Sequence, residues 1–253
     1  MKNRMLLFPL TFLLACTPGN TDPAETQSKE ETAVDTTTAV ADVTMATPTD
    51  YPAVSTLPKD TTIVPPAGWS SLGMATGDLT KDGLAEKVVV YDTPVTTDFG
   101  TARQLYIYQQ KDGRWQLWQK INGGILPSEN GGMMGDPFEG ITIERGTIVI
   151  THFGGSRQKW TYTHRFRYQN ERWELIGASV LAGAPCDAWD QYDYNLSTGK
   201  VEVAHTKEDC DTKKEESRKA TYTHRTRPLP QLAGFEPGNN EVKLPAPEEA
   251  FYY

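Results

Sequence analysis

The chain has 253 residues, enough for one domain of ordinary size or two small ones, of which 38% are hydrophobic and 23% charged. Its formal net charge of −8 argues against a nucleic-acid-binding protein, because such proteins usually carry a basic face. It also lacks a run of about 18 apolar residues, so we expect no membrane-spanning helix.

The amino-terminal residues have the pattern of an export signal. Lys2 and Arg4 precede an apolar run that ends at Ala15, which is too short to cross a bilayer but typical of a signal peptide. The run closes with Leu13-Leu14-Ala15-Cys16, which resembles the lipobox of bacterial lipoproteins. The resemblance implies that residues 1–15 are removed and that the thiol of Cys16 carries a lipid.

The same resemblance predicts a location in the cell. Thr17, rather than an aspartate, follows the cysteine. In lipoproteins this implies the outer membrane if the cell is Gram-negative, and several acyl chains together make a stable membrane anchor. The alternative is an ordinary secretory signal with a buried cysteine.

The residues after the cysteine predict a disordered tether. Residues 17–60 consist mainly of Thr, Ala, Asp, Glu and Pro, with eight acids, two bases and a single aromatic residue, Tyr51. Such a segment buries too little apolar surface to offset the entropy of ordering. We therefore assign residues 16–60 to the lipidated cysteine and its tether, and residues 61–253, which hold all six tryptophans, to a single folded domain.

The pattern of the domain is that of an all-β fold. Apolar residues alternate with polar ones, as in half-buried strands, over 86–91, 104–108, 114–118, 141–143, 147–150, 160–168, 173–176, 192–196, 200–203 and 221–226. Asp112-Gly113 and Arg145-Gly146 lie between such runs and favour tight hairpin turns. We expect antiparallel hairpins in series that form a sandwich or a curved meander, or a propeller-like arrangement. The charged stretch 207–219 is expected to be a solvated excursion.

One motif indicates a metal site. Residues 77–86 read Gly-Asp-Leu-Thr-Lys-Asp-Gly-Leu-Ala-Glu and precede an apolar run. They resemble the calcium loop of FG-GAP and related VCBS repeats. The resemblance assigns the oxygen ligands of a Ca²⁺ ion to Asp78, Thr80, Asp82, Glu86 and the carbonyl of Leu84.

The motif also departs from that family. Thr80 replaces the usual Asp or Asn, and Lys81 adds a positive charge, so both should weaken calcium binding. The alternative is a self-bonded turn without metal. The chain beyond the loop is similar to exported bacterial lipoproteins that carry such a loop, a resemblance that implies no activity.

The two remaining cysteines predict a disulfide. Cys186 and Cys210 are the even pair left when Cys16 is lipidated. Because the export signal places the domain in an oxidising compartment, we expect them to be bonded to each other.

Two surfaces are candidates for binding. The glycine-rich loop 122–140 carries the pair Met133 and Met134, and long loops with exposed methionines suit adaptable contacts. The second is an acidic and aromatic group that could form a cation site or a sugar platform, or simply a polar loop: Asp187, Trp189, Asp190 and Asp193.

The sequence favours a non-catalytic lipoprotein of the cell envelope that presents an all-β domain to a protein or glycan ligand, with a structural calcium ion. A second hypothesis is a glycan hydrolase in which two of the carboxylates of Asp136, Glu139, Asp187 and Asp190 act as acid and base. A third is a purely structural envelope protein.

Overall fold

Antiparallel strands form the regular structure of the chain in the computed structural model, which describes residues 63–245 and 250–253. The signal peptide, the lipidated Cys16 and the tether, predicted for residues 1–60, lie outside the described residues. All the described residues belong to one compact unit.

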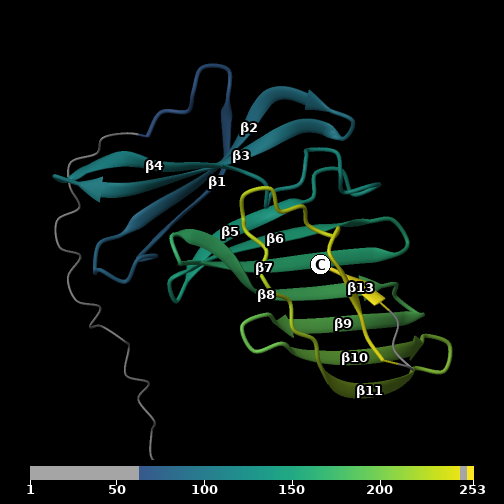
Figure 1. Ribbon diagram of the computed structural model, residues 1–253. Helices are drawn as coiled ribbons and strands as arrows, with labels where there is room; N and C mark the ends of the chain where they lie inside the picture. Colours follow the sequence, from purple (N-terminus) through teal and green to yellow (C-terminus); the bar gives the residue numbers. More distant parts are fainter. Residues whose placement is uncertain (1–62, 246–249) are drawn as a thin grey trace, which may run out of the picture. The chain divides into compact units, whose positions relative to one another are not determined.

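The strands form two large meanders and one short ribbon (Figure 1). The four-stranded sheet has the order β1 (Ser70–Gly77), β2 (Glu86–Thr97), β3 (Gly100–Lys111) and β4 (Arg114–Asn122). The seven-stranded sheet runs through β5 (Phe138–Glu144), β6 (Thr147–Gly155), β7 (Lys159–Gln169), β8 (Arg172–Gly183), β9 (Ala188–Asn195), β10 (Lys200–Asp209) and β11 (Lys214–Thr223). The ribbon pairs β12 (Glu241–Lys243) with β13 (Ala250–Tyr252).

The main core lies between the two large sheets. Val88, Val90, Leu105 and Ile107 of the four-stranded sheet belong to the same buried cluster as residues of β5–β8, such as Phe166. At the edge β1 approaches β5 so closely that a Cβ atom on Gly77 would lie 2.7 Å from the Ile143 Cγ2 atom. As the alternating pattern of the sequence predicts, each of the two large sheets buries one face against the other sheet.

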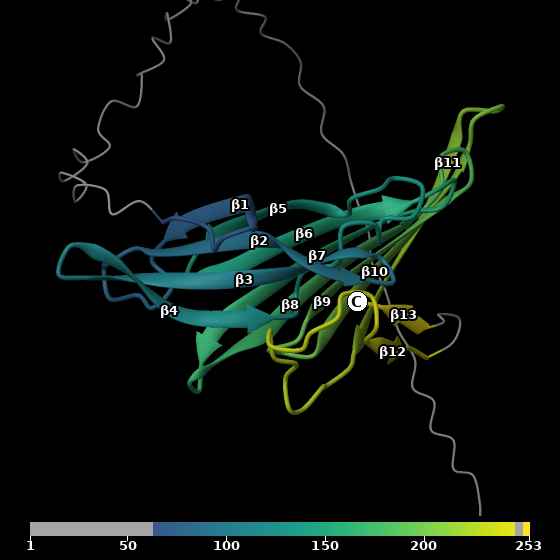
Figure 2. The same ribbon diagram turned by 90° about the horizontal axis from the view of Figure 1, so that it is seen from above.

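The carboxyl-terminal segment covers the part of the seven-stranded sheet that lies beyond the four-stranded sheet (Figure 2). Phe251 of β13 stacks on Tyr192 of β9 with ring centroids 4.5 Å apart, and Leu232 and Phe235 are buried in the main core. The last residue, Tyr253, is only 3% exposed. These contacts explain why β9 and β10 are buried on one face although no strand of the four-stranded sheet covers them.

The hairpins predicted from the sequence are confirmed. Asp112 and Gly113 join β3 to β4 with φ of 52° and 70°, the two positive values of a type I′ turn. Among the described residues there is no helix, so the expectation of an all-β fold of antiparallel hairpins holds. Accordingly, the described part offers no helix long and apolar enough to cross a membrane.

Other predictions were incomplete or wrong. Three strands, β1, β12 and β13, were not predicted. The stretch 207–219, expected to be a solvated excursion, instead forms the end of β10, a tight turn and much of β11. Its side chains are mostly exposed because β11 is an edge strand of the described sheet, so its charges gave no apolar alternation from which a strand could be predicted.

Candidate functional site

The loop that resembles a calcium site connects β1 to β2 and is closed by its own hydrogen bonds. The Asp78 carboxylate accepts the backbone N–H groups of Lys81 and Gly83, at 2.6 and 3.0 Å. The Asp82 carboxylate accepts that of Leu84 at 2.8 Å. Gly83 has a φ of 86°, which fits the sharp turn that both a calcium loop and an Asx turn require.

Glu86 is the buried member of this loop. Its side chain reaches back to accept the N–H of Leu79 at 2.7 Å and that of Thr80 at 3.3 Å. Burial raises the pKa of Glu86, and the nearby charges of Asp82 and Asp78 raise it further, although the two backbone hydrogen bonds oppose the shift. A nearby cation would relieve this concentration of negative charge.

The loop supplies the oxygen types that Ca²⁺ prefers, with Glu86 aimed into the turn. However, within residues 63–245 and 250–253 no three acidic, histidine or cysteine side chains already converge as a metal cluster. Calcium binding at Asp78, Thr80, Asp82, Leu84 and Glu86 therefore stays a prediction.

The loop that joins β4 to β5, residues 123–137, is held by many backbone hydrogen bonds. Its Ser128 and Glu129 N–H groups donate to the carbonyls of Thr101 and Phe99 in the β2–β3 hairpin, at 3.1 and 2.9 Å. Gly155 N–H of the β6–β7 hairpin donates to Gly131 at 2.9 Å. The loop is thus fixed to both large sheets.

The same loop exposes large apolar side chains. Met133 is 85% exposed and Met134 41%, while Phe99 on the adjoining hairpin is 54% exposed. We call Phe99, Met133 and Met134 the loop surface. The Glu129–Phe99 backbone bond brings the two loops together, and exposed apolar side chains that gather in one region mark a candidate contact surface.

Asp136 anchors the far end of this loop. Its carboxylate receives two hydrogen bonds from the buried guanidinium of Arg103, one of them at 2.6 Å, and also the N–H of Phe138. Partial burial would raise the pKa of Asp136, but the hydrogen bonds from Arg103 and Phe138 outweigh it and lower the pKa. A carboxylate held in this state is a poor proton donor, so Asp136 does not suit the acid of a hydrolase.

Two buried histidines lie beneath the loop. His152 on β6 and His164 on β7 have no exposed surface, and both side chains face the main core. The His152 Nε2 atom accepts the Leu126 N–H at 3.3 Å, whereas its Nδ1 atom and both ring nitrogens of His164 have no hydrogen-bond partner. This pair was not predicted, although both residues occupy core-facing positions of alternating strands.

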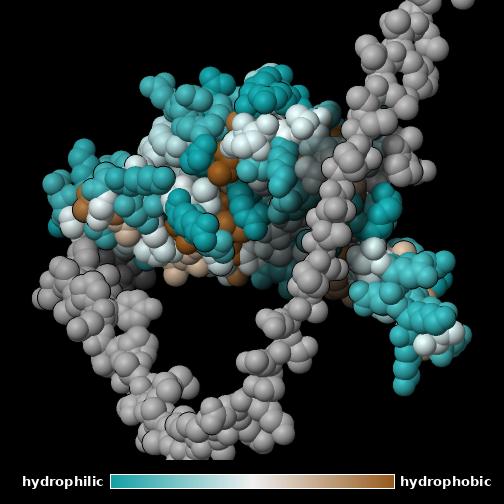
Figure 3. All heavy atoms as spheres, turned by 90° about the horizontal axis from the view of Figure 1, so that it is seen from below, coloured by the Kyte–Doolittle hydropathy of each residue, from teal (hydrophilic) through white to brown (hydrophobic). Residues whose placement is uncertain are grey.

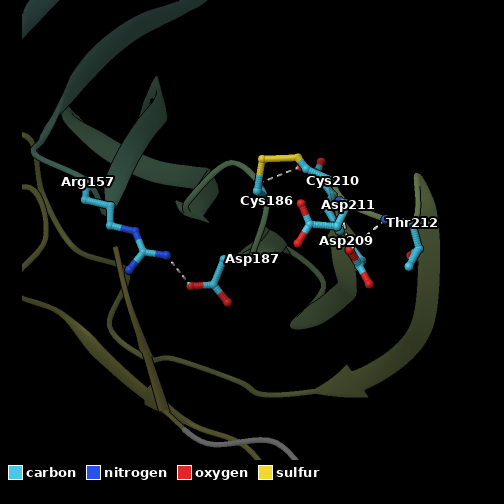
Figure 4. Close-up of a disulfide and its surroundings, with 8 residues drawn as sticks. Arg157, Cys186, Asp187, Asp209, Cys210, Asp211 and Thr212 are labelled. Carbon is cyan, nitrogen blue, oxygen red and sulfur yellow. Dashed lines mark hydrogen bonds and ion pairs between the residues drawn. A yellow bond between two sulfur atoms is a disulfide. The ribbon is translucent and has the colours of Figure 1, made fainter.

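The acidic and aromatic group around β9 does not gather at one point. Asp190 and Asp193 are three residues apart in one strand and so point to opposite faces of the sheet. Asp190 contacts the His205 ring, and Asp193 accepts a hydrogen bond from Ser179. Asp187 pairs with Arg157 at 3.6 Å (Figure 4). Trp189, which lies on β9 next to Asp190, is partly exposed.

The predicted disulfide is present. Cys186 and Cys210 are bonded, with their Cα atoms 5.0 Å apart, and the bond ties the start of β9 to the turn between β10 and β11 (Figure 4). The bond therefore restrains the β10–β11 hairpin, whose outer strand, β11, is exposed.

The four candidate acids of the hydrolase hypothesis lie in different surroundings, and the hypothesis stays a prediction. Three of its four candidate acids, Asp136, Asp187 and Asp190, each face a basic partner, and the fourth, Glu139, is exposed on β5.

Comparison with known proteins adds no assignment. No protein-family model matches the chain, and no curated protein matches it.

Proposed function

We propose that the chain is an exported lipoprotein of the bacterial envelope that holds a non-catalytic binding domain away from the membrane. The lipobox-like end of the signal segment and the polar composition of residues 17–60 support the anchor and the tether. A disulfide in the domain agrees with export, because such bonds persist in oxidising compartments.

The observation that carries the binding role is the loop surface. Its two methionines and Phe99 are exposed although the backbone beneath them is bonded to both large sheets. Figure 3 shows one face of the molecule, where hydrophobic residues appear in small patches among mostly hydrophilic ones; the loop surface itself is defined by the exposed fractions of its three side chains. Flexible, polarizable methionines suit an apolar protein surface better than the hydroxyl groups of a glycan.

A protein ligand is therefore the partner that we favour, and the loop surface is the place where it binds. The calcium loop is proposed as a structural element that stiffens the β1–β2 connection. It approaches the β5–β6 turn, where a Cβ atom on Gly146 would lie 3.0 Å from the Lys81 side chain.

The binding role can be tested by photo-crosslinking in the cell that produces the protein. A photo-reactive amino acid is placed at position 133 of the full chain and, as the control, at Gln116. Gln116 is exposed on the four-stranded sheet, about 20 Å along β4 from the start of the loop. We expect one discrete crosslinked protein from position 133 and none from position 116. Equal, diffuse crosslinking from the two positions would contradict the proposal.

A further inference from the structure

The first residues of the β4–β5 loop are linked to the two buried histidines. The Leu126 N–H donates to His152 Nε2. Two residues earlier, the Gly124 N–H donates to the carbonyl of Phe235 at 2.7 Å, and the Phe235 ring packs edge-on against His164 with centroids 4.8 Å apart. One histidine therefore contacts the loop directly and the other contacts it through Phe235.

The hydrogen bond from Leu126 requires a neutral His152. Nε2 can accept an N–H only while it carries no proton, so the single proton of the ring is on Nδ1. Protonation of Nε2 would bring two donors face to face and would remove the bond. It would also leave a second buried charge beside Arg103, whose guanidinium is already engaged by Asp136.

His164 is in a similar position. Neither of its ring nitrogens has a partner, and it is surrounded by the rings of Tyr162, Phe166 and Phe235. A charge on this ring would have no counter-ion among these neighbours, and burying an unpaired charge is costly. The charged and titratable groups that face the two histidines are Arg103 on β3, Asp136 in the loop, and Tyr162 and Arg165 on β7.

We propose that His152 and His164 form an acid-sensitive latch that holds the beginning of the β4–β5 loop, at Gly124 and Leu126, at neutral pH and loosens it in acid. The loosened segment directly precedes Ser128 and Glu129, whose backbone bonds hold the part of the loop that presents the loop surface. The use of the latch to control partner binding rests on the proposed function, whereas the loosening itself is a property of the fold and is tested without a partner.

The sign of the effect follows from burial. Desolvation lowers the pKa of His152 to about 4 and that of His164 to about 3, and the positive charge of Arg103 adds to the shift at His152. In the opened loop His152 meets water and returns toward its ordinary pKa of 6.5. The open form therefore binds protons first as the pH falls, and the closed form loses stability from about pH 6.5 down to about pH 4.

The experiment is amide hydrogen exchange of the full chain at about pH 7 and about pH 5, expressed as protection factors so that the intrinsic pH dependence cancels. For exposure of His152 alone we expect protection of the Leu126 and Gly124 amides to fall about twentyfold. The control is the same measurement on His152→Gln, in which residue 152 cannot titrate and Leu126 should keep most of its protection at about pH 5. Unchanged protection at Leu126 in the parent chain, or an equal loss in the variant, would overturn the proposal.

Two variants assign the effect. His152→Gln cannot titrate and should abolish most of the pH-dependent loss at Leu126, and His164→Phe, which suits the aromatic surroundings, should remove the part transmitted through Phe235. A pH-dependent loss that persists in the double variant would contradict the latch. If a variant fails to fold, the titration of both histidines by NMR in the unmodified chain decides. Midpoints below about pH 5 support the latch, and midpoints near the ordinary value overturn it.

Discussion

The Arg103 guanidinium and the Asp136 carboxylate meet in a two-point ion pair, although one residue lies near the start of β3 and the other in the loop before β5. The arginine side chain is 1% exposed and the aspartate side chain 47%. The pair thus fixes the far end of the β4–β5 loop, while the histidines hold its beginning.

Replacement of Asp136 by asparagine should weaken this attachment. One of the two accepting oxygens becomes an N–H₂ group that faces a buried guanidinium, and hydrogen bonds to charged groups contribute about 1.5–3 kcal/mol. We expect the free energy of unfolding of Asp136→Asn to fall by about 2 kcal/mol in urea titrations. Glu139→Gln, at an exposed position nearby, serves as the control and should change it by less than about 0.5 kcal/mol. Equal effects in the two variants would mean that the ion pair does not hold the loop.

The close approach of β1 to β5 predicts a second effect. A methyl group at position 77 would overlap with Ile143, so Gly77→Ala should destabilise the domain by about 1–3 kcal/mol. In the Ile143→Ala background the Cγ2 atom is gone, and the nearest remaining atom of residue 143, its Cβ, lies 3.1 Å away. The cost of Gly77→Ala should then largely disappear, and a double-mutant cycle measures this coupling. Strictly additive effects would show that the two strands do not pack as described.

The disulfide should stabilise the domain mainly by restricting its unfolded chain. The two cysteines are separated by 24 residues, and closing such a loop is worth about 3 kcal/mol in the chain-entropy model. A Cys186→Ser/Cys210→Ser variant should lose about this much unfolding free energy, and reducing agent should lower the stability of the unmodified chain but leave the variant unchanged. A variant as stable as the oxidised parent would refute this role.

The proposed calcium site predicts a metal-dependent thermal midpoint. At a hundredfold excess over its Kd, Ca²⁺ stabilises the folded state by about 2.7 kcal/mol, which corresponds to about 5–10 °C for a domain of this size. Asp82→Ala should abolish the difference between Ca²⁺ and chelator. Thr142→Ala, on the exposed face of β5, should retain it. An identical response in Asp82→Ala would remove Asp82 from the site.

The fold was largely predictable where local signals were strong. Asp112-Gly113 and Arg145-Gly146 lie between alternating apolar runs, and each forms a tight turn with positive φ. The edge strands were harder, because β11 exposes charge along most of its length and β1 interrupts its alternation with a bulge after Ser71. After its bulge β1 turns only Gly73, Ala75 and Gly77 inward, so neither strand presents the large alternating apolar residues that period-2 reasoning detects.

The candidate sites were less predictable than the strands. Cysteine pairing needed only the count and the compartment, whereas the ion pair of Arg103 and Asp136 joins residues 33 positions apart through tertiary packing. The histidine latch depends on which face of β6 and β7 is buried. Sequence periodicity can place both rings on one face, but it cannot show that three of their nitrogens lack a partner.

The proposed lipid on Cys16 decides where the domain is located. If Cys16 is lipidated, the chain is exported, the tether begins at a membrane, and the disulfide lies in an oxidising compartment. The most direct measurement is the mass of the mature full-length product purified from the membrane fraction, compared with that of a Cys16→Ser variant. We predict that the product begins at Cys16 and carries the added mass of a diacylglyceryl group. We predict that the variant is neither cleaved before residue 16 nor lipidated. A mature chain that begins at another residue, without lipid and outside the membrane fraction, would contradict the account.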